Sequence, residues 1–100
     1  MNAKSGEQIL DVIGKNKKTL ERLGVKRLGL FGSFAAGRGG PDSDLDFLVE
    51  FERKSFDSYM DLKFFLEETF ERPVDLVCPE AIKPRLKRDI LNATLYVQGL

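Results

Sequence analysis

The sequence contains no histidine, a single cysteine and no apolar run long enough to span a membrane. Without histidine, the chain cannot carry out Ser-His or Cys-His catalysis, and a zinc site is disfavoured. The single cysteine, Cys78, excludes an internal disulfide and is typical of proteins from the reducing cytoplasm. Because Cys78 lies in the apolar run P-V-D-L-V-C, we interpret it as a small buried hydrophobic residue. With no secretory signal pattern, we expect a cytoplasmic protein without a membrane partner.

The sequence also lacks a net charge, because 16 basic residues balance 16 acidic ones. The charges are segregated, however: residues 1–41 hold eight basic and three acidic residues, residues 42–80 four and twelve, and residues 81–100 four and one. Nucleic-acid binding normally requires a larger basic excess, so a nucleic-acid partner is disfavoured. The basic ends suit contacts with phosphates or an acidic partner, although solvated helix faces explain them equally well.

The length of 100 residues, 42% of them apolar, predicts one small domain over residues 1–100. Strand-like and helix-like patterns alternate along it, which indicates an α/β or α+β layered fold. The predicted elements are helical segments at 5–14 and 16–23, a strand at 25–32, a helical turn at 33–37, a strand at 44–51, a helix at 57–70, a strand at 72–79, a helix at 83–91 and a strand at 94–97.

The helix boundaries follow from capping residues. Ser5 and Gln8 have the spacing of a capping box at the start of the first helix, and Asn16 is expected to cap the second. Gly14 and Gly24 are expected to end these two segments.

The helix at 57–70 has an apolar face wider than one buried stripe requires. Either it packs on two sides or part of it is a surface for a partner. Phe64 and Phe65 are neighbours that diverge by about 100°, so both cannot easily be core residues. We expect one of them to face a partner or a second copy of the chain, which leaves a homo-oligomer open.

The segment from Gly32 to Asp46 reads G-S-F-A-A-G-R-G-G-P-D-S-D-L-D and contains the strongest chemical signal. Gly32 and Ser33 follow a strand at the start of a helix, where free backbone N–H groups can bind a phosphate. Asp44 and Asp46 are two residues apart in a strand, so their side chains are expected on one face. Two adjacent carboxylates repel unless a positive group lies between them or one of them is protonated. A divalent metal is the usual answer, because Mg²⁺ binds carboxylates together with substrate phosphates.

Asp75 is a lone acidic residue in the apolar strand V-D-L-V, where a buried charge is costly without a partner. If that strand lies beside the previous one, Asp75 can join Asp44 and Asp46. Three carboxylates could hold two Mg²⁺ ions, one to orient a nucleotide triphosphate and one to lower the pKa of an attacking hydroxyl. Each feature alone also has an ordinary explanation; for Asp75 it is a turn cap or a pair with Arg72 or Lys83.

Gly32-Ser33, ten further residues and then Asp44-Leu45-Asp46 resemble the G-S-x(10)-D-x-D signature of the DNA polymerase β-like nucleotidyltransferases. The length and flanking segments resemble the minimal nucleotidyltransferases, the MntA-type antitoxins that are paired with HEPN ribonuclease toxins. The run R-P-V-D-L-V is similar to the strand that carries the third carboxylate of that family. The resemblance implies a mixed β-sheet with helices mainly on one face, bound ATP and Mg²⁺. It also implies transfer of AMP to a hydroxyl, in the antitoxins a tyrosine of the toxin.

The resemblance assigns the catalytic and metal-binding roles to Asp44, Asp46 and Asp75. It places nucleotide binding at Gly32, Ser33, Arg38 and Ser43. Many family members have arginine at the fifth position of G-S-x-A-R-G, where this chain has Ala36. Arg38, two residues on, is the candidate to replace that phosphate contact.

The sequence is therefore compatible with three functions. In the first, the chain transfers AMP from Mg-ATP to a partner protein, because 100 residues leave no domain for holding an acceptor. In the second, it is a binding module that neutralises a partner by occlusion through the helix at 57–70. In the third, it transfers a nucleotide to a small molecule. The intact carboxylates favour the first.

Overall fold

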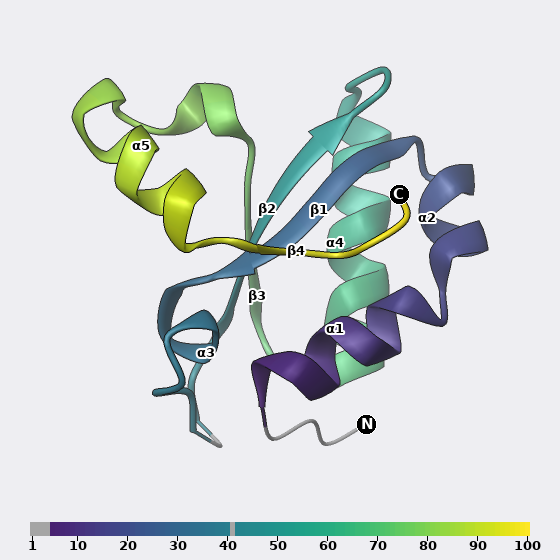
Figure 1. The fold of residues 1–100 in the computed structure, drawn as a ribbon. Coiled ribbons are helices and arrows are strands. Elements are labelled where there is room, and N and C mark those ends of the chain that lie inside the picture. The colour runs from purple at the N-terminus through teal and green to yellow at the C-terminus, as the bar shows by residue number, and fades with distance from the viewer. Residues whose placement is uncertain (1–4, 41) are drawn as a thin grey trace.

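The computed structural model describes residues 5–40 and 42–100. Within them, one four-stranded sheet has the order β3-β2-β1-β4, and its strands cross the centre of the molecule in Figure 1. β1 pairs antiparallel with both β2 and β4, whereas β2 and β3 are parallel, so the sheet is mixed as expected. The strands are β1 (Val25–Phe31), β2 (Leu45–Phe51), β3 (Val74–Val77) and β4 (Leu95–Tyr96).

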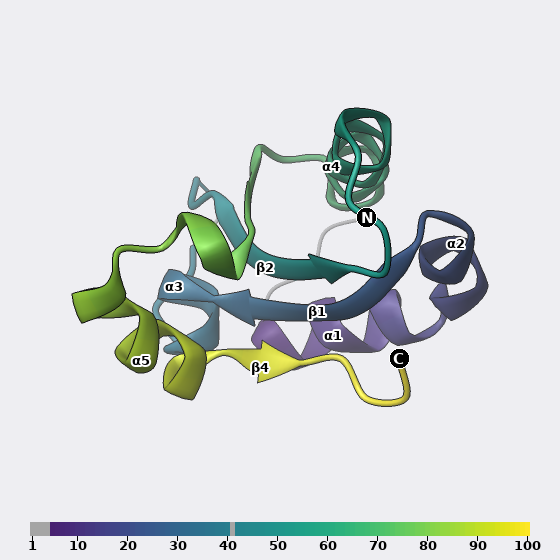
Figure 2. The ribbon, with the colours of Figure 1, turned by 90° about the horizontal axis from the view of Figure 1, so that it is seen from above.

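The helices are α1 (Gly6–Gly14), α2 (Lys17–Arg22), α3 (Gly32–Ala35), α4 (Phe56–Phe70), the 3₁₀ turn η1 (Pro79–Ala81) and α5 (Pro84–Ala93). In the described residues, no helix combines the length and the apolar character that crossing a bilayer requires. Figures 1 and 2 both show α5 well away from α2 and α4.

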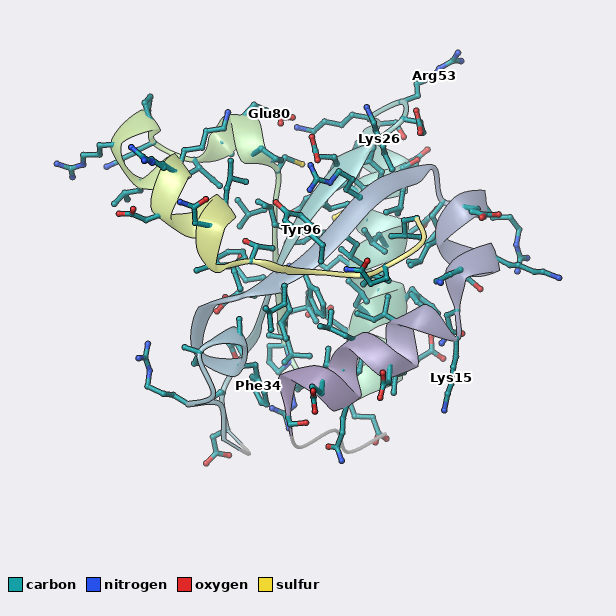
Figure 3. All side chains as sticks on the ribbon, in the orientation of Figure 1. Lys15, Lys26, Phe34, Arg53, Glu80 and Tyr96 are labelled. Carbon is teal, nitrogen blue, oxygen red and sulfur yellow. The ribbon has the colours of Figure 1, made fainter. Side chains whose placement is uncertain are left out.

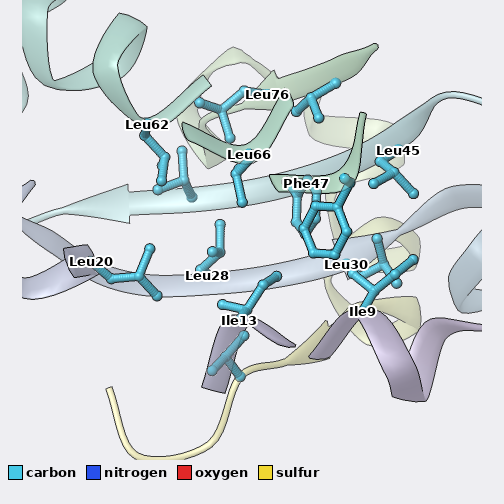
Figure 4. Close-up of a cluster of buried hydrophobic side chains, with 14 of the residues drawn as sticks. Ile9, Ile13, Leu20, Leu28, Leu30, Leu45, Phe47, Leu62, Leu66 and Leu76 are labelled. Atoms are coloured by element: carbon cyan, nitrogen blue, oxygen red, sulfur yellow. The ribbon is translucent and has the colours of Figure 1, made fainter. Parts of the chain in front are cut away.

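One face of the sheet forms the hydrophobic core with α1, α2 and α4 (Figure 4). The residues of β1 and β2 that share this face are paired with each other: Leu28 lies opposite Val49, and Leu30 opposite Phe47. Their side chains are almost completely buried, because the three helices supply apolar side chains above them. The helix contributions are Ile9, Val12, Ile13, Leu20, Leu62, Leu66 and Phe70. The expectation of helices mainly on one face is thus confirmed.

The predicted capping of α1 is confirmed and that of α2 is wrong. Ser5 Oγ accepts the N–H of Gln8 at 3.2 Å, and the helix ends at Gly14. Asn16 occupies the N-cap position of α2, but its side chain instead donates to the carbonyl of Val12 at 2.8 Å. The Val12 carbonyl, which also accepts the N–H of Lys15, lies near the end of α1 within reach of this amide, and the amide donates to it rather than capping α2. Gly24 follows α2 with a φ of 77°, as a helix-ending glycine should.

Several strand limits differ from the prediction by one or two residues. β2 begins at Leu45, so Asp44 lies just before the strand. β3 is limited to four residues, Val74–Val77, because the flanking prolines cannot donate to a ladder. The turn η1 was not predicted. Cys78, between β3 and η1, is buried as expected, and burial raises the pKa of its thiol.

The prediction that Phe64 and Phe65 are not both core residues is confirmed. Phe64 is 57% exposed, whereas Phe65 packs partly buried against the core. Phe56, two turns before Phe64, is 77% exposed. Phe64 lies on the side of α4 away from its buried residues Leu62 and Leu66, whereas Phe56 is exposed as the first residue of the helix.

Candidate active site

Asp46 is the residue around which the site is built. It pairs with Phe31, the last residue of β1, and with Asp75 in the parallel strand β3. Partners in a parallel ladder point to the same face, so the Asp46 and Asp75 side chains share the face opposite the core. The alternation of β3 agrees, because Val74 and Leu76 are buried while Asp75 is exposed. The sheet thus brings together two residues that are 29 positions apart in the sequence.

Gly32 lies directly against the Asp46 carboxylate. A Cβ atom added at this position would stand 2.2 Å from Asp46 Oδ2, which is far inside van der Waals contact. The φ of Gly32 is 77°, a left-handed conformation that side chains disfavour. Both observations require glycine here. The turn that begins α3 is therefore built to bring its backbone next to the carboxylate.

The electrostatics of the site are those of crowded carboxylates. Burial raises the pKa of Asp46, and the charges of Asp75 and Asp44 raise it further. Asp75 forms no ion pair or side-chain hydrogen bond within residues 5–40 and 42–100, so pairing with Arg72 or Lys83 does not explain it. Asp44 is exposed just before β2. Negative charge thus accumulates on this face, and neither Arg72 nor Lys83 pairs with Asp75 to balance it.

The donor set fits Mg²⁺ better than it fits a closed protein cage. In the described parts of the chain, no three His, Cys, Asp or Glu side chains are grouped closely enough to hold a metal ion as they stand. Mg²⁺ does not require such a group, because it is usually held by one or two carboxylates together with substrate phosphates and water. Asp46, with Asp44 two residues before it and Asp75 beside it, offers oxygen ligands of this kind.

The other predicted nucleotide-binding residues lie in the turn and loop that lead from α3 to β2. Ser33 is the second residue of α3, and its carbonyl accepts the backbone N–H of Arg38 at 2.7 Å. The Arg38 side chain is exposed. Ser43 Oγ accepts the backbone N–H of Gly40 at 3.1 Å, so this hydroxyl already serves the loop as an acceptor. The structure therefore gives Ser43 a local role that the sequence did not indicate.

Arg72 is a residue of this region whose role sequence reasoning missed. Its Nη1 donates to the carbonyls of Gly40, at 3.1 Å, and Ser43, at 3.2 Å. The sequence offered Arg72 only as a partner for Asp75. Contacts to backbone carbonyls leave no pattern in side-chain spacing, so the sequence carried no signal for this one.

A mixed sheet with helices mainly on one face, and with carboxylates beside a Gly-Ser turn on the other, agrees with the predicted nucleotidyltransferase fold. Residues 13–97 match the family model described as "Nucleotidyltransferase domain". The match covers most of the chain, and the chain belongs to this family.

Similar proteins match this chain over nearly its whole length. "Protein adenylyltransferase MntA" of Thermococcus cleftensis is 37% identical over 93 residues, which cover 91% of this chain and 94% of that protein. The solved "Structure of putative minimal nucleotidyltransferase" superposes with a TM-score of 0.78 at 31% identity, over 95% of this chain and 98% of that one. The predicted resemblance to minimal nucleotidyltransferases is confirmed.

A third likeness concerns the fold alone. The structure described as "tri-AMPylated Shewanella oneidensis HEPN toxin in complex with MNT antitoxin" has a TM-score of 0.60 at 20% identity. It covers 89% of this chain and 72% of that one.

Proposed function

We propose that the chain transfers AMP from Mg-ATP to a hydroxyl of a partner protein, and that the acceptor is a tyrosine of a HEPN-type toxin. The observation that carries the proposal is the register of Asp46 beside Asp75 on the face opposite the core, with Gly32 against the Asp46 carboxylate. The name of the Thermococcus cleftensis relative supports protein adenylylation. The AMPylated toxin in the Shewanella oneidensis complex supports the class of acceptor.

Each carboxylate has a separate task in this proposal. Asp44 and Asp46 would hold Mg²⁺, which would neutralise and orient the triphosphate of ATP. Asp75 faces the open side of the sheet, where an acceptor can approach, and it takes the proton from the acceptor hydroxyl or holds a second metal there. When bound, Mg²⁺ supplies positive charge at the phosphates and makes the acceptor hydroxyl more acidic.

The reaction is a displacement at the α-phosphorus of ATP. The acceptor oxygen bonds to the α-phosphorus of ATP while the bond from that phosphorus to the bridging oxygen breaks, and pyrophosphate leaves. The N–H groups of the Gly32-Ser33 turn and the Ser33 hydroxyl donate to the phosphates. Arg38, exposed at the end of this turn, and Ser43 are the remaining candidates for phosphate contacts.

A second function, neutralisation of a partner by occlusion, is supported by one observation. Phe56, at the start of α4, and Phe64, on its outer side, expose large apolar side chains. Exposed apolar residues of this size suit a protein partner or a second copy of the chain. Occlusion and AMP transfer are compatible, because α4 packs on the face of the sheet opposite the carboxylates. For transfer to a small molecule, the structure adds no supporting observation.

The test is to express the chain together with a HEPN-type toxin and to incubate the purified pair with Mg-ATP. We expect the intact mass of the toxin to rise by whole AMP units, and the modified residue to be a tyrosine. The matched control is Asp46→Asn, which should bind the toxin without modifying it. Toxin that keeps its original mass with the wild-type chain, while its ribonuclease activity is inhibited, would favour occlusion instead.

A further inference from the structure

We infer that Arg72 is a positioning residue, which holds the loop before β2 so that Asp44 is kept beside Asp46. The inference rests on the proposed function, because it concerns the same carboxylates. Arg72 lies between α4 and β3, and its Nη1 donates to the carbonyls of Gly40 and Ser43, at 3.1 and 3.2 Å. Ser43 directly precedes Asp44. A single guanidinium nitrogen therefore fixes the backbone at the entrance to the carboxylate pair.

The same guanidinium also contacts α3. Its carbon lies 4.9 Å from the centroid of the Phe34 ring, within the range of a cation–π interaction. Phe34 is buried and follows Ser33 in α3. A Cβ atom added at Gly39 would meet that ring at 2.4 Å, so the loop backbone lies against Phe34. Arg72 thus links the Gly-Ser turn to the loop that carries Ser43.

The backbone on both sides of Arg72 is anchored. Before it, α4 ends at Phe70, and the next residue, Glu71, turns the chain with a left-handed φ of 54°. After it, the carbonyl of Pro73 accepts the N–H of Leu45 at 3.1 Å, and the N–H of Val74 donates to Glu67 at 3.1 Å. Arg72 is therefore held from the helix side and from the sheet side. This allows its side chain to fix the loop.

Repulsion between the carboxylates explains why such a hold is needed. Asp44 is exposed and lies outside the ladder of β2, so sheet hydrogen bonds do not hold its side chain toward Asp46. The charges of Asp44, Asp46 and Asp75 would push a free loop away. Two hydrogen bonds from a charged donor oppose that movement, and hydrogen bonds of this kind are stronger than neutral ones.

The test exchanges arginine for lysine, which keeps the charge but loses the planar fork and its stacking. The variant is Arg72→Lys, and its control is Arg27→Lys. Arg27 stacks on Tyr96 at 4.2 Å and pairs with Glu50 at 3.4 Å. Figure 3 shows Tyr96 over the middle of the sheet and Phe34, a residue of α3, at the end of the sheet, so the control lies away from the loop.

The first readout is amide hydrogen exchange without nucleotide or metal. Arg72→Lys loses one hydrogen bond from the charged side chain to the loop carbonyls, so the loop should open more often. We therefore expect the amides of Gly40 and Ser43 to exchange about tenfold faster. Arg27→Lys should leave both amides unchanged. Unchanged exchange in Arg72→Lys would overturn the inference, whatever the activity of the protein.

The second readout is the Mg²⁺ concentration that gives half-maximal AMP transfer. We expect it to rise about tenfold in Arg72→Lys and the rate to recover at saturating Mg²⁺, because metal binding can then order the loop. Faster exchange with an unchanged Mg²⁺ requirement would make Arg72 a structural residue only and overturn its positioning role. If the wild-type chain transfers no AMP, the proposed function fails; Mg²⁺ affinity by calorimetry then replaces transfer, with the same two outcomes.

A variant at a second residue covers the case in which Arg72→Lys does not fold. Phe34→Leu removes the ring that Arg72 stacks on and keeps an apolar side chain in α3. We expect the same faster exchange at Gly40 and the same higher Mg²⁺ requirement, both smaller in size. An unchanged Gly40 amide in this variant also counts against the inference.

Discussion

The two faces of the sheet surround their side chains differently: the covered face lies under α1, α2 and α4, and the open face carries Asp46 and Asp75. On the face that α1, α2 and α4 cover, side chains such as Leu45 and Phe47 are fully buried among apolar neighbours. On the opposite face, Asp46 lies against another backbone at Gly32 and beside a second carboxylate at Asp75. The covered face lowers the free energy of the fold. The open face holds like charges together, which raises it.

At the start of β2, this difference assigns stability to Leu45 and chemistry to Asp46. Leu45 and Asp46 are neighbours in β2, and strand alternation sends their side chains to opposite faces. Substitutions at adjacent positions should therefore change different properties. The first predictions test whether the two faces are separable in this way.

The largest expected effect is that of Asp46→Asn on AMP transfer. It removes a proposed metal ligand, and we expect a loss on the order of a thousandfold or more, with the fold intact. Single-turnover transfer at saturating ATP and Mg²⁺ measures it. Full activity together with wild-type metal affinity would refute the role of Asp46.

The same variant should stabilise the protein at neutral pH when no divalent metal is present. Because the pKa of Asp46 is raised in the folded state, ionising it costs stability as the pH rises through that pKa. Asn removes this cost, so its advantage should appear above the folded pKa and vanish below the ordinary value of 3.8. Thermal melts over this pH range provide the measurement.

The next effect is that of Asp75→Ala, which should slow the chemistry far more than it weakens ATP binding. Loss of a base near the acceptor costs on the order of a hundredfold or more in rate. Asp44 and Asp46 would still hold the metal on the triphosphate, so the ATP dissociation constant should change little. Equal losses in binding and transfer would show that Asp75 is a general metal ligand.

The covered face should respond in the opposite way. Leu45→Ala leaves a cavity at a fully buried position and should lower the free energy of unfolding by about 2–5 kcal/mol. The remaining folded fraction should keep a nearly normal Kd for Mg-ATP. Urea denaturation measures the loss, and Leu95→Ala, at a 41% exposed leucine, is the control with an expected change of about 0.5 kcal/mol or less. If both leucines cost the same, the assignment of the core is wrong.

Gly32 and Gly37 test the close approach at the boundary between the faces. Both have a left-handed φ, 77° and 76°, but an added Cβ meets Asp46 at Gly32 and nothing within 4 Å at Gly37. Gly37→Ala should cost only the backbone strain, about 1–2 kcal/mol. Gly32→Ala should cost more and also displace the Asp46 carboxylate, so that transfer falls. Chemical denaturation and transfer rates compare the two, and equal effects would mean that the contact at Gly32 is unimportant.

The sequence predicted the layers of the fold because apolar periodicity and glycine positions are local signals. It predicted α1 from Ser5 to Gly14, and the spacing of Asp44 and Asp46 indicated a carboxylate pair. It placed Asp75 with Asp44 and Asp46 only on the condition that the third strand lies beside the second, because the pairing of β2 with β3 depends on the whole sheet. The sequence also could not predict that Gly32 lies against Asp46 or that Arg72 contacts Gly40 and Ser43. These contacts involve backbone atoms and join residues that are distant in the sequence, so they leave no local pattern.

The smallest effect expected concerns Ser33, whose hydroxyl should donate to the triphosphate. Ser33 is the second residue of α3, directly after the turn that Gly32 makes against Asp46. A hydrogen bond to a charged group contributes about 1.5–3 kcal/mol when well shielded, and Ser33 is partly exposed. We therefore expect Ser33→Ala to weaken ATP binding by about tenfold or less, with kcat nearly unchanged at saturating ATP. Calorimetry with Mg-ATP measures the affinity, and Ser58→Ala, in α4 on the other side of the sheet, should have no effect. If Ser33→Ala binds ATP as tightly as the wild type, Ser33 serves only the turn, and the backbone N–H groups of Gly32 and Ser33 are left as the contacts from this turn.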